Sequence, residues 1–242
     1  MKDWNKWDVE AGTAAGGAGL YPNMMESPQL RWGFIRKVYL IVAFQLLLTI
    51  VVAVAINLID PIRHFLLART TASLVLSLFI MILPLLVMFP MMYFSHRHPV
   101  NLVLLFLFTV CLGLSVGLVC MNRDGKVILQ AATLTAAVVM GLTLYTFWAA
   151  KRGHDFNFLG PFLFAAVLAL SIFSLIHFFF PMGKTTTMVF GCISAIVFSG
   201  FIVYDTDNLI KRHSYDEYVS AAISLYLDII NLFLALLSIM DD

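Results

Sequence analysis

The chain has 242 residues, of which 61% are hydrophobic and only 12% are charged. Ordinary globular proteins contain roughly 45–50% apolar and about 25% charged residues, so this chain lacks the polar side chains that would cover a soluble fold. Its formal net charge of +1 provides no basic surplus to neutralise phosphates, so nucleic acid is not an expected partner. The composition excludes soluble globular, disordered, collagen-like and coiled-coil proteins and favours a polytopic membrane protein.

The first 34 residues differ from the rest of the chain. They are rich in glycine and proline, carry scattered charges and have little apolar surface to bury. We expect a flexible cytosolic segment over 1–34 and a membrane domain over 35–242. No apolar stretch with a small-residue cleavage site precedes the first long apolar run, so that run is expected to act as an uncleaved signal anchor.

Long apolar runs and short polar breaks make up the remainder. A helix needs about 20 residues to cross roughly 30 Å of hydrocarbon, and seven runs are long enough. The predicted spans are Val38–Leu58, Ser73–Phe94, Val100–Met121, Val127–Ala150, Leu159–Phe180, Thr187–Tyr204 and Tyr218–Met240. The runs do not alternate in polarity, which excludes a membrane barrel. Short loops make consecutive spans antiparallel, so the expected fold is all-α, a bundle of seven transmembrane helices.

The positions of Lys and Arg predict the orientation, because cytosolic loops carry an excess of both. With the N-terminus in the cytosol, the cytosolic side carries Arg31, Arg36, Lys37, Arg97, Lys151, Arg152, Lys211 and Arg212. The opposite side then carries Arg63, Arg69, Arg123, Lys126 and Lys184. The bias predicts a cytosolic N-terminus, and seven spans place the C-terminus on the far side.

Small residues inside the spans have structural interpretations. Gly113 and Gly117 lie on one face of the third span, where they let a neighbouring helix approach closely. Cys111, Cys120 and Cys192 lie in apolar stretches without a C-x-x-C pair, so we expect buried thiols rather than a disulfide framework or a zinc site.

Signatures of soluble enzymes are absent from the sequence: it contains no G-x-S-x-G, H-E-x-x-H, Walker loop or G-x-G-x-x-G. No enzyme activity and no catalytic residue are therefore expected. The cluster His96-Arg97-His98 is interpreted as solvated charge in a loop, and His177 as an interfacial residue hydrogen-bonded to a neighbour.

A third polar cluster lies in the last two spans. Asp228 has apolar sequence on both sides, and a carboxylate at mid-span costs about 2.5–3.5 kcal/mol, so it should face a partner inside the bundle. Asp205 and Asp207 are two residues apart, about 200° around a helix, so only one of them can face Asp228. Asn231 shares the face of Asp228, and Tyr204 precedes Asp205; together with Asp207 they are the candidate supporting residues.

Two interpretations of this cluster remain open. In the first, Asp228 is protonated and only donates a hydrogen bond that helps the helices pack. In the second, Asp205 and Asp228 form a carboxylate pair on a proton or ion pathway. Nearby carboxylates in a poorly solvated site cannot readily both ionise. Their hard oxygens also suit Ca²⁺, which makes Asp205 and Asp228 candidate metal ligands, although two carboxylates give few ligands and weak binding. No other cofactor is expected.

Three motifs carry a family resemblance: F-I-R-K-V-Y at 34–39, Y-D-T at 204–206 and L-Y-L-D-I-I-N-L-F at 225–233. From about Phe34 to the C-terminus, the chain resembles the transmembrane Bax-inhibitor-motif family (Bax inhibitor and Lifeguard proteins). The first motif and D-E-Y at 216–218 are most similar to the plant type of the Lifeguard branch.

The resemblance implies a seven-helix bundle with helix seven near its centre. It implies membrane proteins that suppress programmed cell death and lower the Ca²⁺ content of the endoplasmic reticulum. Bacterial members resemble pH-sensitive Ca²⁺ leaks with paired membrane aspartates, whose positions match Asp205 and Asp228. Those members also have an arginine latch in the second helix, whereas Ser73–Phe94 contains no Lys or Arg.

The leading hypothesis is a Ca²⁺ leak or Ca²⁺/H⁺ exchanger in the endoplasmic reticulum or another endomembrane, through which cell death is suppressed. The alternative is a non-conducting membrane scaffold that binds membrane proteins of cell-death or stress pathways. The expected partners are the lipid bilayer, Ca²⁺ and H⁺, with protein partners in the second case.

Overall fold

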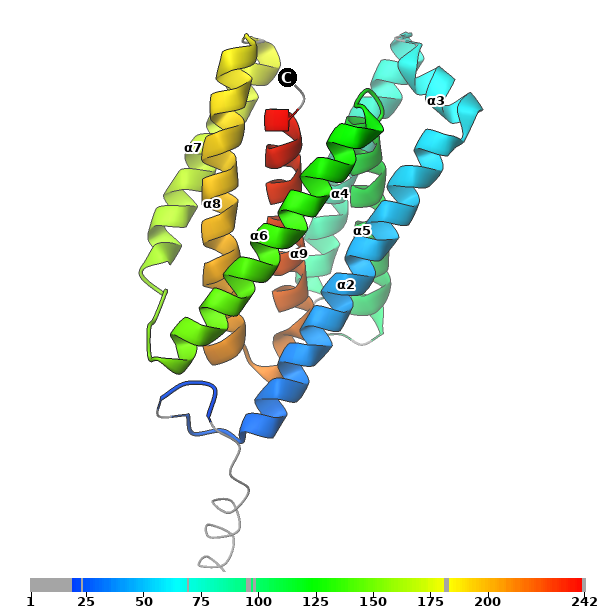
Figure 1. Ribbon diagram of the computed structural model, residues 1–242. Coiled ribbons are helices and arrows are strands. Elements are labelled where there is room, and N and C mark those ends of the chain that lie inside the picture. Colours follow the sequence, from blue (N-terminus) through cyan, green and yellow to red (C-terminus); the bar gives the residue numbers. More distant parts are fainter. Residues whose placement is uncertain are drawn as a thin grey trace, which may run out of the picture.

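The computed structural model describes residues 19–22, 24–68, 70–94, 97, 99–180 and 183–240, which form helices and no strand. Seven helices in these ranges are long and apolar enough to cross a membrane, which confirms the predicted fold class (Figure 1). They are α2 (Pro28–Leu58), α4 (Thr71–Tyr93), α5 (Val100–Cys120), α6 (Gly125–Lys151), α7 (Leu159–Phe179), α8 (Lys184–Lys211) and α9 (Tyr218–Met240).

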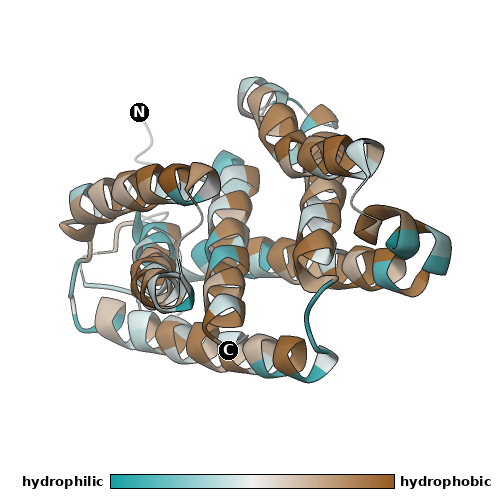
Figure 2. Cartoon of the chain, turned by 90° about the horizontal axis from the view of Figure 1, so that it is seen from above, coloured by the Kyte–Doolittle hydropathy of each residue, from teal (hydrophilic) through white to brown (hydrophobic). Residues whose placement is uncertain are grey.

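Helix α9 lies at the centre of the bundle, as expected for helix seven (Figure 1). It packs against α8, α6, α2 and α5, and its buried side chains include Ala222, Tyr226 and Leu232. Helix α7 packs chiefly on α8, and α4 chiefly on α5. The outer helices expose many large apolar side chains. Hydrophobic residues also run along most of the length of these helices (Figure 2). This surface suits lipid and not water, so the chain is an integral multi-pass membrane protein.

Helix α5 approaches α2 closely at its two glycines. A Cβ atom added at Gly113 would lie 3.0 Å from Cβ of Val52, and one added at Gly117 would overlap the Ile56 side chain and lie 3.0 Å from Cα of Ala53. The Gly117 carbonyl also accepts a hydrogen bond of 3.0 Å from the Asn57 amide. The structure thus places both glycines in a helix–helix contact.

Two helices, α2 and α8, extend well beyond the apolar runs that predicted them. Helix α2 begins at Pro28, ten residues before the expected span, because the Ser27 hydroxyl caps it and a proline suits its first turn. It therefore includes the last part of the segment expected to be flexible, whereas residues 1–18 lie outside the described residues. Helix α8 continues beyond Tyr204 to Lys211, so the polar residues that follow Tyr204 are helical.

An additional short helix, α3 (Asp60–Leu67), connects α2 and α4, where the sequence suggested only a break. Asp60 and Pro61 occupy its first turn, which favours a helix start, but eight residues are too few to register as a span. No α3 residue is buried.

The thiol prediction is correct for Cys111 and Cys120 and wrong for Cys192. All three are free, but Cys192 is exposed on the outward face of α8, where lipid replaces protein as the apolar surrounding. In the loop before α5, Arg97 is exposed, while His96 and His98 lie outside the described residues.

Candidate functional site

The structure brings Asp205 of α8 and Asp228 of α9 together. Their carboxyl groups are hydrogen-bonded to each other, and only 6% of the Asp228 surface is exposed. Because two carboxylates offer no hydrogen between them, this bond requires a proton on one of the pair. The second Asp228 oxygen, Oδ2, is buried and has no hydrogen-bond partner among the described residues. The pair can therefore hold or release a proton at the junction of two central helices.

Groups from the end of α8 support the pair on one side. The Asn208 amide donates a hydrogen bond to the Asp205 carboxyl, and its own oxygen accepts one of 2.7 Å from Arg212. His213 lies close enough to Asp205 for electrostatic interaction. Asp205 thus connects Asp228 to polar groups at the end of the bundle.

Asp207 faces away from the pair, as the helical spacing required. It is completely buried, forms ion pairs with Lys211 (2.5 Å) and Arg212 (3.2 Å), and accepts a hydrogen bond of 3.3 Å from the Phe156 amide. Arg212 also pairs with Asp155, and this contact lowers the pKa of the Asp155 carboxyl. Asp207 therefore ties the end of α8 to the loop between α6 and α7.

The other two candidate supporting residues, Tyr204 and Asn231, have partners other than the aspartates. The Tyr204 hydroxyl packs over Gly160 of α7, where an added Cβ would lie 2.9 Å from it. The Asn231 amide donates to the Leu227 carbonyl at 2.9 Å within α9. Asn231 instead faces a cavity.

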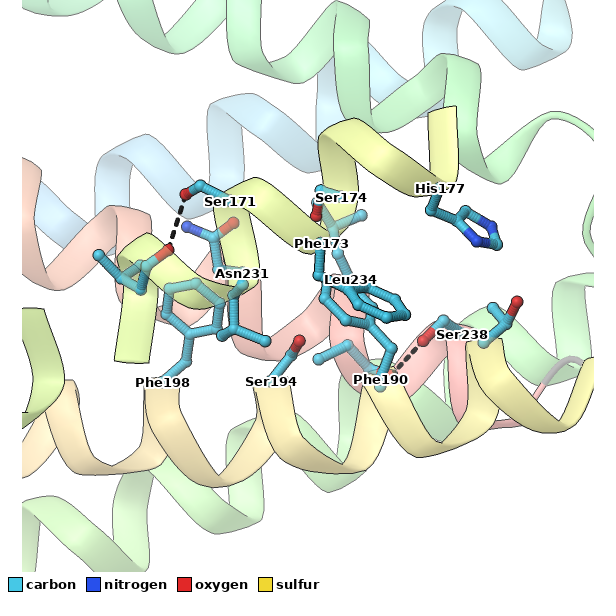
Figure 3. Close-up of a pocket in the computed structure, with 15 residues that line it drawn as sticks. Ser171, Phe173, Ser174, His177, Phe190, Ser194, Phe198, Asn231, Leu234 and Ser238 are labelled. Carbon is cyan, nitrogen blue, oxygen red and sulfur yellow. Dashed lines mark hydrogen bonds between the residues drawn. The ribbon is translucent and has the colours of Figure 1, made fainter. Parts of the chain in front are cut away.

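This cavity has a volume of about 370 Å³ and lies between α7, α8 and α9 (Figure 3). Phe173, Phe190 and Phe198 form part of its wall, together with other apolar side chains and several polar ones. Its polar lining residues are Ser171, Ser174, His177, Thr187, Ser194, Asn231 and Ser238. Asn231 lies toward one end, one turn beyond Asp228 along α9, and His177 lies toward the other (Figure 3).

The sequence did not reveal this cavity. His177 was expected to be hydrogen-bonded at the membrane interface, but it lines the cavity, and its buried Nδ1 has no partner among the described residues. Thr187, Gly191 and Ser194 recur at helical spacing along α8. This repeat of small and polar residues was a usable signal, because such residues mark the inward face of a membrane helix.

A second buried polar group joins α2, α5 and α9. The Thr49 and Tyr226 hydroxyls are 2.7 Å apart, and the Gln45 amide donates to the Thr109 hydroxyl at 3.1 Å. Single polar residues inside apolar runs were the available signal for these contacts.

No group of three or more His, Cys, Asp or Glu side chains that could hold a metal ion occurs in the described part of the chain. Because Ca²⁺ takes six to eight oxygen ligands in proteins, Asp205 and Asp228 could supply only part of such a shell.

Comparison with known proteins gives the family. Residues 31–242 match the family described as "Inhibitor of apoptosis-promoting Bax1". Over 99% of this chain and 98% of the relative, the sequence is 60% identical to "Protein LIFEGUARD 4" of Arabidopsis thaliana. It is 40% identical to "Protein lifeguard 4" of Mus musculus and to the "Golgi anti-apoptotic protein" of Vaccinia virus (strain Lister), over 89% of this chain and 87% of each relative. The chain belongs to the Bax inhibitor family and is of the plant Lifeguard type.

Proposed function

We propose that this protein is a pH-sensitive Ca²⁺ leak or Ca²⁺/H⁺ exchanger that suppresses programmed cell death. The observation that carries the proposal is the hydrogen-bonded carboxyl pair of Asp205 and Asp228 at the junction of α8 and α9. Polar and ionisable residues inside a membrane are expensive and typically mark proton or ion pathways. The anti-apoptotic name of the viral relative supports the cellular role.

The polar cavity supports a route on one side of the pair. It begins one turn from Asp228 at Asn231 and extends along α9 toward Ser238, near the end opposite the start of α2. Hydroxyl and amide groups along its wall can replace part of the hydration shell of an ion. On the other side, Asn208 and the charged end of α8 lead to the opposite face.

A proton shared by Asp205 and Asp228 makes the Ca²⁺ flux depend on pH. While one proton bridges Asp205 and Asp228, it holds α8 against α9. Its loss leaves two negative charges close together where the dielectric is low, and their repulsion there exceeds its value in water. The helices then separate or admit a cation, so Ca²⁺ flux increases as the pH rises. This switch needs no arginine in the second span, which suits the absence of Lys and Arg from α4.

The test is Ca²⁺ flux into dye-loaded liposomes as a function of pH. Wild-type flux should rise with pH, whereas Asp205→Asn and Asp228→Asn should reduce flux to near background and remove its pH dependence. Asp124→Asn is the matched control: Asp124 is an exposed N-cap of α6, and asparagine caps as well as aspartate. A flat wild-type profile, or one that both dyad variants leave unchanged, contradicts the mechanism.

Varying Ca²⁺ separates gating from competition, because protons and Ca²⁺ compete for the same carboxyl oxygens. Competition predicts that saturating Ca²⁺ abolishes the inhibition by acid. Gating predicts that part of the inhibition remains. An absence of flux in every variant, with protein partners still bound, would favour the second candidate function, a membrane scaffold for cell-death or stress regulators.

We further propose an endomembrane location, in the endoplasmic reticulum or a related compartment, with the N-terminus in the cytosol. The distribution of Lys and Arg supports the orientation. An N-terminal tag should be digested by protease added to sealed microsomes. Its protection would contradict the orientation.

A further inference from the structure

A groove between α2 and α5 remains outside the proposed ion pathway. It encloses about 680 Å³ at the end of the bundle where α2 begins. Apolar side chains of α2 and α5 form most of its wall, namely Leu40, Ile41, Phe44, Leu102, Leu105 and Phe106. Leu40, Phe44, Leu102 and Phe106 also expose much of their surface, so the groove opens sideways toward lipid. Its volume is in the range of pockets that bind small molecules.

The mouth of the groove lies at the edge of the hydrocarbon. Arg36 and Lys37 line the mouth, and the apolar run of α2 begins directly after them at Val38. About 20 residues cross the hydrocarbon, so a span that starts at Val38 puts both basic residues at the level of the lipid headgroups.

The mouth is positively charged. Lys37 lies with its ammonium group 3.3 Å from the ring centre of Tyr218, which fixes that cation at the entrance. Arg36 is exposed and takes part in none of the ion pairs found among the described residues. The first turn of α5 lies at the same end, because Leu102 faces the groove, and a helix N-terminus adds partial positive charge.

The deep end of the groove is polar. Gln45 lines it, is 1% exposed and donates its amide hydrogen to Thr109, but its oxygen has no hydrogen-bond partner among the described residues. Gln45 is nine residues beyond Arg36, roughly 13 Å along the helix. The groove thus has a cationic mouth, an apolar middle and a floor with one open acceptor.

We propose that this groove binds an anionic phospholipid, with the headgroup at Arg36 and Lys37 and an acyl chain along the apolar wall. Charge complementarity selects an anionic headgroup, and the lateral opening onto lipid admits a chain from the bilayer. The buried oxygen of Gln45, which has no hydrogen-bond partner among the described residues, marks the end of the apolar section. The site is separate from the pair of Asp205 and Asp228, so it stands without the proposed transport function.

The test is native mass spectrometry of the full-length protein, purified with equal amounts of phosphatidylserine and phosphatidylcholine that carry the same acyl chains. The wild-type protein should retain one phosphatidylserine in preference to phosphatidylcholine. Arg36→Gln should reduce this preference roughly fivefold, the effect of one basic residue near an anionic surface. Lys151→Gln is the matched control, because Lys151 is exposed at the same end of the bundle but does not line the groove.

A second variant blocks the groove without changing charge. A Cβ atom added at Gly33, which lines the mouth, meets nothing within 4 Å, so Gly33→Leu should project into open space and fill the entrance. Leucine favours a helix more than glycine does, so this variant should fold. It should lose the bound lipid whatever the headgroup.

Three results would overturn the proposal. The first is equal retention of the two lipids by the wild-type protein. The second is a loss in Lys151→Gln as large as that in Arg36→Gln. The third is complete displacement of the lipid by the water-soluble headgroup glycerophosphoserine at equal concentration, because the acyl chain would then contribute nothing.

Discussion

The centre and the rim of the bundle are built from equally apolar helices that pack very differently. In the most apolar stretch of α9, 44% of the residues are buried, whereas in that of α7 only 6% are. Helix α9 contacts four long helices, whereas α7 packs chiefly against α8. Two buried polar side chains in the middle of α9, Asp228 and Tyr226, have hydrogen-bond partners on other helices and distinguish its sequence from that of α7.

The comparison shows what polar residues contribute in a membrane. Lipid tails are as apolar as leucine, so apolar side chains give no preference for a central position. Buried carboxyl, hydroxyl and amide groups do favour a central position, because each needs a hydrogen-bond partner that lipid cannot supply. Substitutions at these groups should therefore weaken the bundle more than substitutions at the rim.

The largest expected effect is at Asp207. Asp207→Asn leaves Lys211 and Arg212 without their buried partner, while the side chain keeps its size. Breaking a buried ion pair costs about 3–5 kcal/mol, and we expect about 3 kcal/mol because the two cations are 13% and 33% exposed. Unfolding in a titration with denaturing detergent measures the change.

The control for Asp207 is Asp155→Asn, since Asp155 pairs with the same arginine but its side chain is 57% exposed. We expect a loss of less than about 1 kcal/mol, as for exposed ion pairs. Equal losses in the two variants would show that burial at the end of α8 does not set the strength of these pairs.

The next effect concerns the contact between α2 and α5. Gly117→Leu forces a side chain into Ile56 and Ala53, and overpacking of this kind costs typically 1–3 kcal/mol, so we expect about 2 kcal/mol. At Gly141 of α6, an added Cβ meets nothing within 4 Å, so Gly141→Leu should leave the free energy of unfolding unchanged or slightly raised. Thermal unfolding in detergent micelles compares the two. A similar loss at both positions would mean that leucine itself, and not the contact, causes the effect.

The same difference between apolar and polar side chains explains which parts of the structure could be predicted from the sequence. The apolar runs gave the seven spans, and the isolated acid Asp228 pointed to an inward face with Asp205 as its partner. The extension of α8 to Lys211 was missed because Asp205, Asp207 and Lys211 lower the hydropathy, although ion pairs four residues apart continue the helix.

The cavity and the groove between α2 and α5 depend on which faces of separate helices meet. Ser194 and Asn231 face one cavity only because α8 packs on α9, and Arg36 and Leu102 share a groove only because α5 packs on α2. The spacing of residues within one helix can indicate which face of that helix turns inward, but it does not identify the helix that packs against this face. Contacts of this kind therefore remained beyond reach of the single sequence.

The smallest expected effect is the pH dependence at Asp155, at the rim of the charged cluster. The hydrogen bond from Arg212 and the one from the Asn157 amide lower the pKa of its carboxyl in the folded protein. A lowered pKa contributes stability above the unfolded value, near 3.9, and this contribution disappears as the pH falls through the folded pKa. Asp155→Asn should therefore reduce the free energy of unfolding slightly at pH 7 and by less at about pH 3, which lies below the unfolded pKa. Arg212→Gln provides the matched background: there the effect of Asp155→Asn at pH 7 should shrink, since the main cause of the lowered pKa is gone. An Asp155→Asn effect that is the same at both pH values, or that Arg212→Gln leaves at full size, would contradict this account of the contact.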